Sequence, residues 1–201
     1  MRLLLKLVTI ITLFTITINA NEAVFEDVKR TLAMMESGNK KNIVNSRGFL
    51  GKYQLGAMSL IEAGFVKLKN YKALTYTQKT STRAAKVMWR DGYSLTKFLN
   101  EEQNWNIAGG KRAFLASDEL QDEAMDRILR KNAKRLERAG IDMSNPKLAK
   151  SLLMSAHLGG VKSAIALYRN GTDYKDEYGT SIKRYYQADK NSQNGIIKFE
   201  N

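Results

Sequence analysis

Apolar residues recur at intervals of three and four from residue 21 onward, which is the spacing of one face of an α-helix. The first such run predicts a helix from Asn21 to Glu36, and Gly38 is well suited to ending it. A polar loop or small hairpin is expected over residues 39–50, and a second apolar period predicts a helix over residues 56–65. The apolar face of the first helix consists of Phe25, Val28, Leu32 and Met35.

The middle of the chain has a weaker pattern. Residues 67–82 are polar and predict an irregular segment or a short helical one, whereas residues 82–89 have a brief helical pattern. Residues 91–110 contain Trp105 and the pair Gly109-Gly110, and we expect a loop around a short helix there. These segments therefore contribute little to the assignment of a fold.

The C-terminal half has stronger helical signals. Ser117 is a capping hydroxyl followed by two acidic residues, so a helix is expected from there to about Arg138. Asn145-Pro146 opens another helix, because Pro is favoured in the first helical turn. The remaining predicted boundaries are helix ends at Gly140 and Gly159-Gly160, a helix over residues 161–168 closing near Gly171, and a short helix capped by Thr180.

Together these patterns predict a mainly α fold with at most a small β element near Gly48 to Gln54. A chain of 201 residues is long enough for one domain with its own core. A single Pro leaves long helices uninterrupted. We expect one domain over residues 21–187, followed by a polar tail over residues 188–201.

The first twenty residues form a separate segment. Arg2 and Lys6 precede a run of apolar residues and Thr that ends near the small residue Ala20. This order is typical of a secretory signal peptide, so we expect cleavage near Ala20 and a periplasmic or secreted protein. The alternative is a retained membrane anchor, although the uncharged run is close to the lower limit of ~17 residues for a span.

The chain is strongly basic, with 33 Lys and Arg against 20 Asp and Glu and a net charge of +13. Such a charge attracts nucleic acid, an anionic membrane surface or an acidic wall polymer. Export favours the wall polymer, and we expect no nucleic-acid partner. The chain has no Cys and a single His, His157, which excludes a disulfide framework and leaves a metal site or a Ser-His-Asp triad short of partners. We expect neither a metal nor a cofactor.

Three short motifs follow one another along the chain. They are Glu36-Ser37 at a helix end, Gly51-Lys52-Tyr53-Gln54 after the polar loop, and Ala156-His157-Leu158-Gly159-Gly160 in a late helix. In order and approximate spacing they resemble the motifs of the lytic transglycosylase group of the lysozyme superfamily, in the variant found in phage tails and secreted wall hydrolases. Typical members have Glu-Ser, Gly-Leu-Met-Gln and Ala-Tyr-Asn-x-Gly, so this chain departs from the pattern in the second and third motifs.

The resemblance covers roughly residues 25–186 and implies a lysozyme-like fold, as in goose-type lysozyme and soluble lytic transglycosylases, with a cleft between two lobes. It implies cleavage of the β-1,4 bond between N-acetylmuramic acid and N-acetylglucosamine in peptidoglycan glycan strands, with Glu36 as the single general acid and base. In this family the sugar's own C6 hydroxyl attacks the anomeric carbon and leaves 1,6-anhydromuramic ends. Apolar cover from Met34, Met35 or Phe49 would raise the pKa of Glu36 and keep it protonated.

Each motif residue also has a structural interpretation. A Glu at a helix end is most often a solvated surface residue, Ser37 is equally a helix cap, and Gln54 is otherwise a loop amide. By resemblance, Ser37 orients Glu36 or the substrate, while Tyr53 and Gln54 bind the saccharide. His157 is either a semi-buried helix histidine or a substrate-binding residue at the family's Tyr-Asn position.

Other functions stay open at this point. A hydrolytic muramidase on the same fold needs a second carboxylate, such as Glu62 or Asp118, beside a water molecule. A non-catalytic basic module that binds cell wall or nucleic acid would account for the charge and for the basic run from Arg127 to Arg138. Association with a secretion apparatus or a phage-like machine is compatible with each function, and the oligomeric state is not encoded in these motifs.

Overall fold

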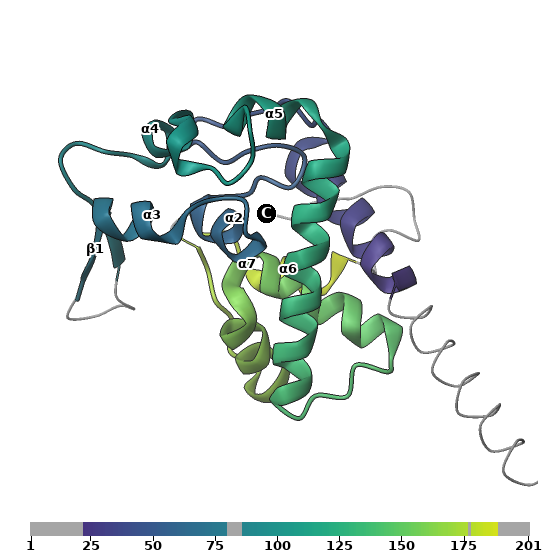
Figure 1. Cartoon of the computed structure of the whole chain (residues 1–201). Coiled ribbons are helices and arrows are strands. Elements are labelled where there is room, and N and C mark those ends of the chain that lie inside the picture. The colour runs from purple at the N-terminus through teal and green to yellow at the C-terminus, as the bar shows by residue number, and fades with distance from the viewer. Residues whose placement is uncertain (1–21, 80–85, 177, 189–201) are drawn as a thin grey trace, which may run out of the picture. The chain divides into compact units, whose positions relative to one another are not determined.

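The computed structural model describes residues 22–79, 86–176 and 178–188 (Figure 1). The described residues are mainly helical with one two-stranded antiparallel sheet, which confirms the predicted fold class in outline. Within these ranges no helix is both long enough and apolar enough to cross a membrane. The predicted leader lies outside the described residues, as does nearly all of the predicted tail.

The described residues form two compact units. One consists of residues 32–128, and the other of residues 22–31 and 129–188. Along the chain, a helix over residues 22–37 and the long helix α6 (Asp118–Arg138) each belong in part to both units. A single domain over residues 21–187 stays a prediction.

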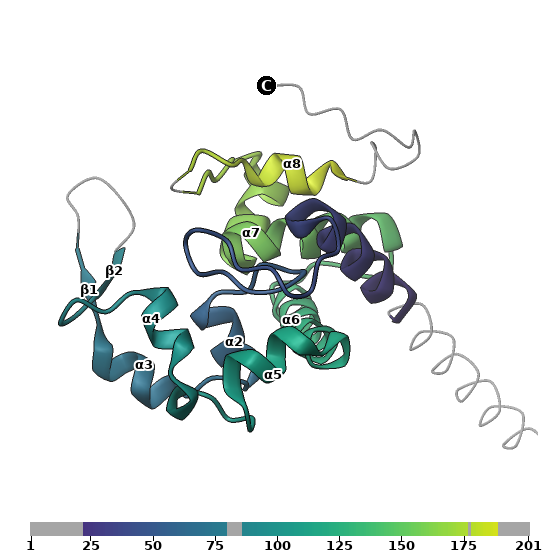
Figure 2. The ribbon, with the colours of Figure 1, turned by 90° about the horizontal axis from the view of Figure 1, so that it is seen from above.

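The unit of residues 32–128 contains most of the short elements. Strands β1 and β2 pair antiparallel, with Thr75 opposite Trp89 and Gln78 opposite Lys86. Figures 1 and 2 show the pair at the end of this unit where α3 and α4 lie. The elements before α6 are α2 (Ala57–Ala63), α3 (Leu68–Leu74), β1 (Thr75–Gln78), β2 (Lys86–Trp89), α4 (Leu95–Asn100), the 3-10 helix η1 (Glu102–Asn104) and α5 (Gly110–Ala116).

The strand pair corrects the sequence analysis in one segment. The pattern of residues 82–89 predicts a helix, but residues 86–89 form strand β2. Such a short run is below the length at which a helix is stable by itself, and pairing with β1 satisfies its backbone groups instead. The preceding polar segment, for which an irregular or short helical structure was the expectation, contains α3 and β1.

An aromatic cluster lies in the core of this unit. Phe114 of α5 contacts Phe65 edge-on with ring centroids 5.7 Å apart, and it contacts Trp105 at 5.6 Å. Phe98 of α4 contacts Tyr71 of α3 at 5.7 Å. Phe98 and Phe114 are fully buried, and burial of such a side chain stabilises a fold by about 1.5–3 kcal/mol. The cluster therefore holds short helices together that would not be stable alone.

Helix α6 confirms the prediction of a helix from Ser117 to about Arg138. The hydroxyl of Ser117 accepts a hydrogen bond from the N–H of Leu120 at 3.1 Å, which caps the helix start. The helix ends at Arg138, and Gly140 follows with φ of 78°.

The second unit is built around α7 (Pro146–Asn170) and α8 (Ile182–Tyr186), which pack together (Figure 2). The side chain of Asn145 caps α7, as predicted. At Gly160 the helix is kinked, with φ of 75° and ψ of 164°, and here the sequence predicted a boundary between two helices. The cap of α8 is Ser181 instead of Thr180.

A buried ion pair joins the first helix to α7 inside this unit. Lys150 is 4% exposed, and its Nζ lies 2.6 Å from Oδ2 of Asp27. Burial raises the pKa of Asp27, but the hydrogen bonds and charges of Lys150 and Arg30 outweigh burial and bring that pKa below its ordinary value. The pair therefore stabilises this unit where Asp27 is ionised.

Candidate functional site

The first helix ends at the first motif. Glu36 and Ser37 are its last residues, and Gly38 and Asn39 follow with φ of 63° each. The N–H of Asn39 donates to the carbonyl of Ala33 at 2.8 Å, which closes the helix with a left-handed turn. Glu36 is half-buried, so a residue that is partly removed from water stands at the end of a rigid element.

The apolar surroundings predicted for Glu36 need one correction. Met34 is 56% exposed. It lies two positions before Glu36 on the helix and so points to the opposite side, where it does not cover the Glu36 carboxyl group. Met35 and Phe49 are half-buried, and they stay the candidates for apolar cover.

Ser37 connects the first motif to the second. Its hydroxyl lies 3.0 Å from the carbonyl oxygen of Lys52 and 3.2 Å from that of Ala33. A hydroxyl has one proton to donate, and the Lys52 carbonyl is the nearer acceptor. The same oxygen accepts from the N–H of Lys40 at 3.0 Å. The Glu-Ser helix end and the Gly-Lys-Tyr-Gln loop are thus in direct contact, which their order in the sequence does not by itself establish.

The second motif is a tight turn between short backbone pairings. Leu50 and Leu55 exchange both backbone hydrogen bonds, at 3.1 and 2.9 Å, and Leu50 also forms a bridge with Val44. Residues 51–54 close the turn, with Gly51 at φ of 72° and Gln54 at φ of 48°. The small β element that the sequence predicts here is present as isolated bridges.

Gln121 of α6 makes three hydrogen bonds, which join this turn to the segments at Lys41 and Phe114. Its Oε1 accepts from the N–H of Lys52 at 2.8 Å, and its Nε2 donates to the carbonyls of Lys41 and Phe114, each at 3.0 Å. A Cβ at Gly51 would lie 2.2 Å from that Oε1. Gly51 is therefore required both by its left-handed backbone and by the close approach of Gln121.

An ion network fixes the loop through Lys52. The Lys52 side chain is 8% exposed, and its Nζ lies 3.0 Å from Oδ1 of Asp118 and 2.9 Å from Oδ1 of Asp122. Burial lowers the pKa of Lys52, but the hydrogen bonds and charges of the two carboxylates outweigh burial and raise that pKa above its ordinary value. Hydrogen bonds from Lys41 and Lys52 lower the pKa of Asp118. Lys52 and Asp118 are therefore both charged at neutral pH.

Tyr53 and Gln54 differ in what they offer to a ligand. Tyr53 is 2% exposed, and its hydroxyl donates to Oδ1 of Asp122 at 2.5 Å. This position favours a supporting role for Tyr53 over the sugar contact that the resemblance implies, because a buried ring has no face open to a ligand.

Gln54 is half-buried, and its Nε2 donates to the carbonyl of Gly51 at 2.8 Å. Its left-handed backbone is unusual for a residue other than Gly, and strained backbone is concentrated at functional sites. Gln54 is therefore the better candidate of the two for substrate contact.

The third motif lies in the other unit, on α7. His157 is half-buried, and its ring centroid lies 6.4 Å from that of Tyr185 in α8. A Cβ at Gly159 would lie 2.7 Å from Ile182, so this glycine permits the close packing of α7 and α8. Gly160 forms the kink. The two glycines thus shape this unit, and substrate binding by His157 stays a prediction.

The first turns of α6 contribute residues whose role sequence reasoning missed. Gln121 and Asp122 support the second motif, and Asp118 pairs with both Lys41 and Lys52. A signal was present, because Gln121 falls on the apolar face of α6 that includes Met125. A polar side chain at such a position is normally buried only when it is hydrogen-bonded. Glu62, the other candidate for a second carboxylate, is half-buried in α2.

The described residues include no group of three or more His, Cys, Asp or Glu side chains arranged to hold a metal ion. No family model, no curated protein and no solved structure matches the chain. Its function has therefore to be inferred from the site itself.

Proposed function

We propose that the chain is an exported peptidoglycan lytic transglycosylase with a lysozyme-like fold, in which Glu36 is the single general acid and base. The observation that carries the proposal is the 3.0 Å hydrogen bond from Ser37 to the Lys52 carbonyl. It holds the helix end that bears Glu36 against the Gly-Lys-Tyr-Gln loop. Contact between these two motifs is what a shared saccharide site requires.

The proposed reaction needs one carboxyl group. Glu36 donates its proton to the glycosidic oxygen as the bond from N-acetylmuramic acid to N-acetylglucosamine breaks. The C6 hydroxyl of the muramic residue bonds to the anomeric carbon, and the Glu36 carboxylate takes the proton of that hydroxyl. Glu36 is then protonated again. The products are a 1,6-anhydromuramic end and an N-acetylglucosamine end whose hydroxyl carries the proton that Glu36 donated.

The neighbouring residues have distinct proposed roles. Ser37 keeps the helix end and the loop in register, and the side chain of Gln54 hydrogen-bonds the sugar or its N-acetyl group. Lys52 and Tyr53 fix the loop through the carboxylates of α6. Reacting groups act efficiently when their supporting residues lock them in position.

A digest of purified sacculi tests the proposal. Wild-type protein should release muropeptides with anhydro ends, which mass spectrometry distinguishes from reducing ends. Glu36→Gln should lower release by about 10²–10⁴, the usual contribution of general acid–base catalysis. Glu123→Gln is the matched control, because Glu123 lies in the same unit on the surface of α6 and is 49% exposed. It should release muropeptides at the wild-type rate.

Two other functions are distinct outcomes of the same digest. Reducing ends would identify a hydrolytic muramidase, although Asp118 is engaged with two lysines and is poorly placed to activate a water molecule. Binding to sacculi without release would identify a non-catalytic module, and tighter binding to DNA than to sacculi would point to nucleic acid. Export belongs to the same proposal, and N-terminal sequencing of the secreted protein should begin near Asn21.

A further inference from the structure

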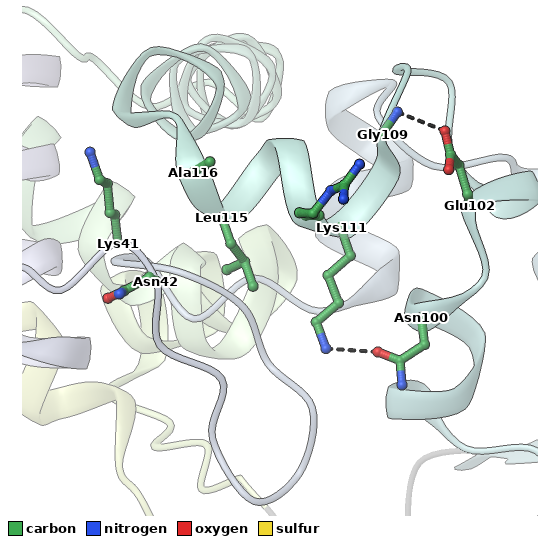
Figure 3. Close-up of a pocket in the computed structure, with 9 residues that line it drawn as sticks. Lys41, Asn42, Asn100, Glu102, Gly109, Lys111, Leu115 and Ala116 are labelled. Atoms are coloured by element: carbon green, nitrogen blue, oxygen red, sulfur yellow. Dashed lines mark hydrogen bonds between the residues drawn. The ribbon is translucent and has the colours of Figure 1, made fainter.

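A pocket apart from the three motifs lies in the unit of residues 32–128. Its volume is about 690 Å³, within the range of roughly 300–1,000 Å³ that is common for small-ligand sites. Figure 3 shows Lys41 and Asn42 on one side of it and Leu115 and Ala116 of α5 along its wall. The lining is completed by Asn100 at the end of α4, Glu102 of η1, Gly109, and Lys111 and Arg112 of α5. We call this cavity the α5 pocket.

Cations dominate the α5 pocket. Lys41, Lys111 and Arg112 line it, and the charge of Lys41 is compensated by Asp118 at 2.8 Å. The Nζ of Lys111 donates to Oδ1 of Asn100 at 2.7 Å, a neutral acceptor that leaves the charge uncompensated. Among the described residues, neither Lys111 nor Arg112 forms an ion pair. Two neighbouring uncompensated cations favour a ligand with carboxylate or phosphate groups.

The rest of the lining favours carboxylates on a peptide over phosphates. Glu102 is exposed in the same pocket, and its Oε1 accepts from the N–H of Gly109 at 2.7 Å. Its negative charge repels a polyphosphate and attracts an ammonium group. Leu115 and Ala116 offer a small apolar surface, and the amides of Asn42 and Asn100 can bond peptide groups.

We propose that the α5 pocket binds an acidic peptide that has small apolar side chains and a free ammonium group. Lys111 and Arg112 would bind its carboxylates, Glu102 its ammonium group, and Leu115 and Ala116 its methyl groups. The stem peptides of peptidoglycan, with Ala, Glu and diaminopimelate residues, have this chemistry. Their identification as the source rests on the proposed function, whereas the class of ligand rests on the pocket itself.

The test is a titration of the wild-type chain with a synthetic tetrapeptide of L-Ala, γ-linked D-Glu, meso-diaminopimelate and D-Ala, followed by calorimetry. The peptide has no glycosidic bond, so the result does not depend on catalysis by Glu36. Replacing Lys111 and Arg112 together by Gln should weaken binding at least tenfold. Replacing the exposed Lys69 and Lys72 of α3 by Gln removes the same charge elsewhere in this unit. This control should change the dissociation constant by no more than about twofold.

Further arms identify the ligand class. A tetrapeptide with amidated carboxylates should bind at least tenfold more weakly than the free acid. Inorganic phosphate should not displace the peptide at equal concentration. Arg112→Gln alone should weaken binding and leave folding unchanged, since Arg112 is exposed and makes no hydrogen bond or ion pair within the described part of the chain.

Several results would overturn the pocket proposal. One is the absence of binding at ~10 mM peptide, because a dissociation constant above that is too weak for a specific site. The others are an equal loss of affinity in the α3 control, equal binding of the amidated peptide, and displacement of the peptide by phosphate. Failure here would remove the pocket proposal alone. Undiminished muropeptide release by Glu36→Gln would remove Glu36 as the catalytic acid and would leave the class of ligand assigned to the pocket untouched.

Discussion

The ion network around Lys52 makes a quantitative prediction about the loop that carries the second motif. Asp118→Asn or Asp122→Asn alone leaves the Lys52 ammonium with one carboxylate and one neutral acceptor. Hydrogen bonds to charged groups contribute about 1.5–3 kcal/mol and neutral ones about 0.5–1.5 kcal/mol. The side chains of Asp118 and Asp122 are 47% and 38% exposed, so solvent screening brings the contribution of each charged hydrogen bond toward the lower end of its range. Each single variant should lose about 1 kcal/mol of unfolding free energy.

The double variant should lose more than the sum of the two single variants. It leaves a side chain that is 8% exposed without a counterion, and an uncompensated buried charge costs about 3–5 kcal/mol. In addition, each single variant relieves the repulsion between the two carboxylates, a relief that the double variant can gain only once. We therefore expect a loss of about 3 kcal/mol for the double variant and a coupling free energy of about 1 kcal/mol.

Urea unfolding at pH 7, followed by circular dichroism, measures these free energies. Adding Lys52→Met to the double variant should restore part of the lost stability, because the methionine removes the buried charge and keeps an apolar stem of similar size. Additive losses in the double variant, or a further loss on adding Lys52→Met, would refute the role assigned to the buried ammonium.

Three further predictions concern the packing of Gly51, the role of Gln54 and the stability of the protein at acid pH. Gly51→Ala should lower the unfolding free energy by about 2 kcal/mol or more in urea, because its Cβ would meet Gln121 at 2.2 Å and its φ is left-handed; a loss below about 0.5 kcal/mol would contradict this packing. Gln54→Gly should keep or raise stability by relieving about 1 kcal/mol of left-handed strain while lowering muropeptide release; full activity would make Gln54 a structural residue. Because the folded-state pKa values of Asp27 and Asp118 are lowered, their stabilisation is present above the ordinary carboxyl pKa of about 4 and is lost as pH falls through the lowered values. Thermal unfolding should show this loss below pH 4, with a shallower fall in Asp118→Asn, and an unchanged profile in that variant would count against the ion network.

Sequence patterns predicted those elements whose structure depends on local signals. The end of the first helix at Glu36-Ser37, the cap at Ser117 and the long helix after it follow from periodicity and capping residues in the chain itself. The strand over residues 86–89 escaped prediction, because its stability comes from pairing with β1 and not from its own four residues.

The motifs of the candidate site could be predicted from the sequence, but the residues that hold the second motif in place could not. Glu36, Ser37 and Gln54 could be singled out from short motifs, whereas the burial of Tyr53 and Lys52 depends on carboxylates more than sixty residues later in the chain. Such distant partners leave only an indirect mark on the sequence. Here the mark is Gln121, a buried polar residue on the mainly apolar face of α6.

The most direct test of the central claim is the sacculus digest with wild-type protein and Glu36→Gln. We expect wild type to release 1,6-anhydro muropeptides. Glu36→Gln, folded as judged by circular dichroism, should still bind sacculi but release muropeptides about 10²–10⁴-fold more slowly. Near-wild-type release of muropeptides by Glu36→Gln would contradict the assignment of Glu36 as the catalytic acid.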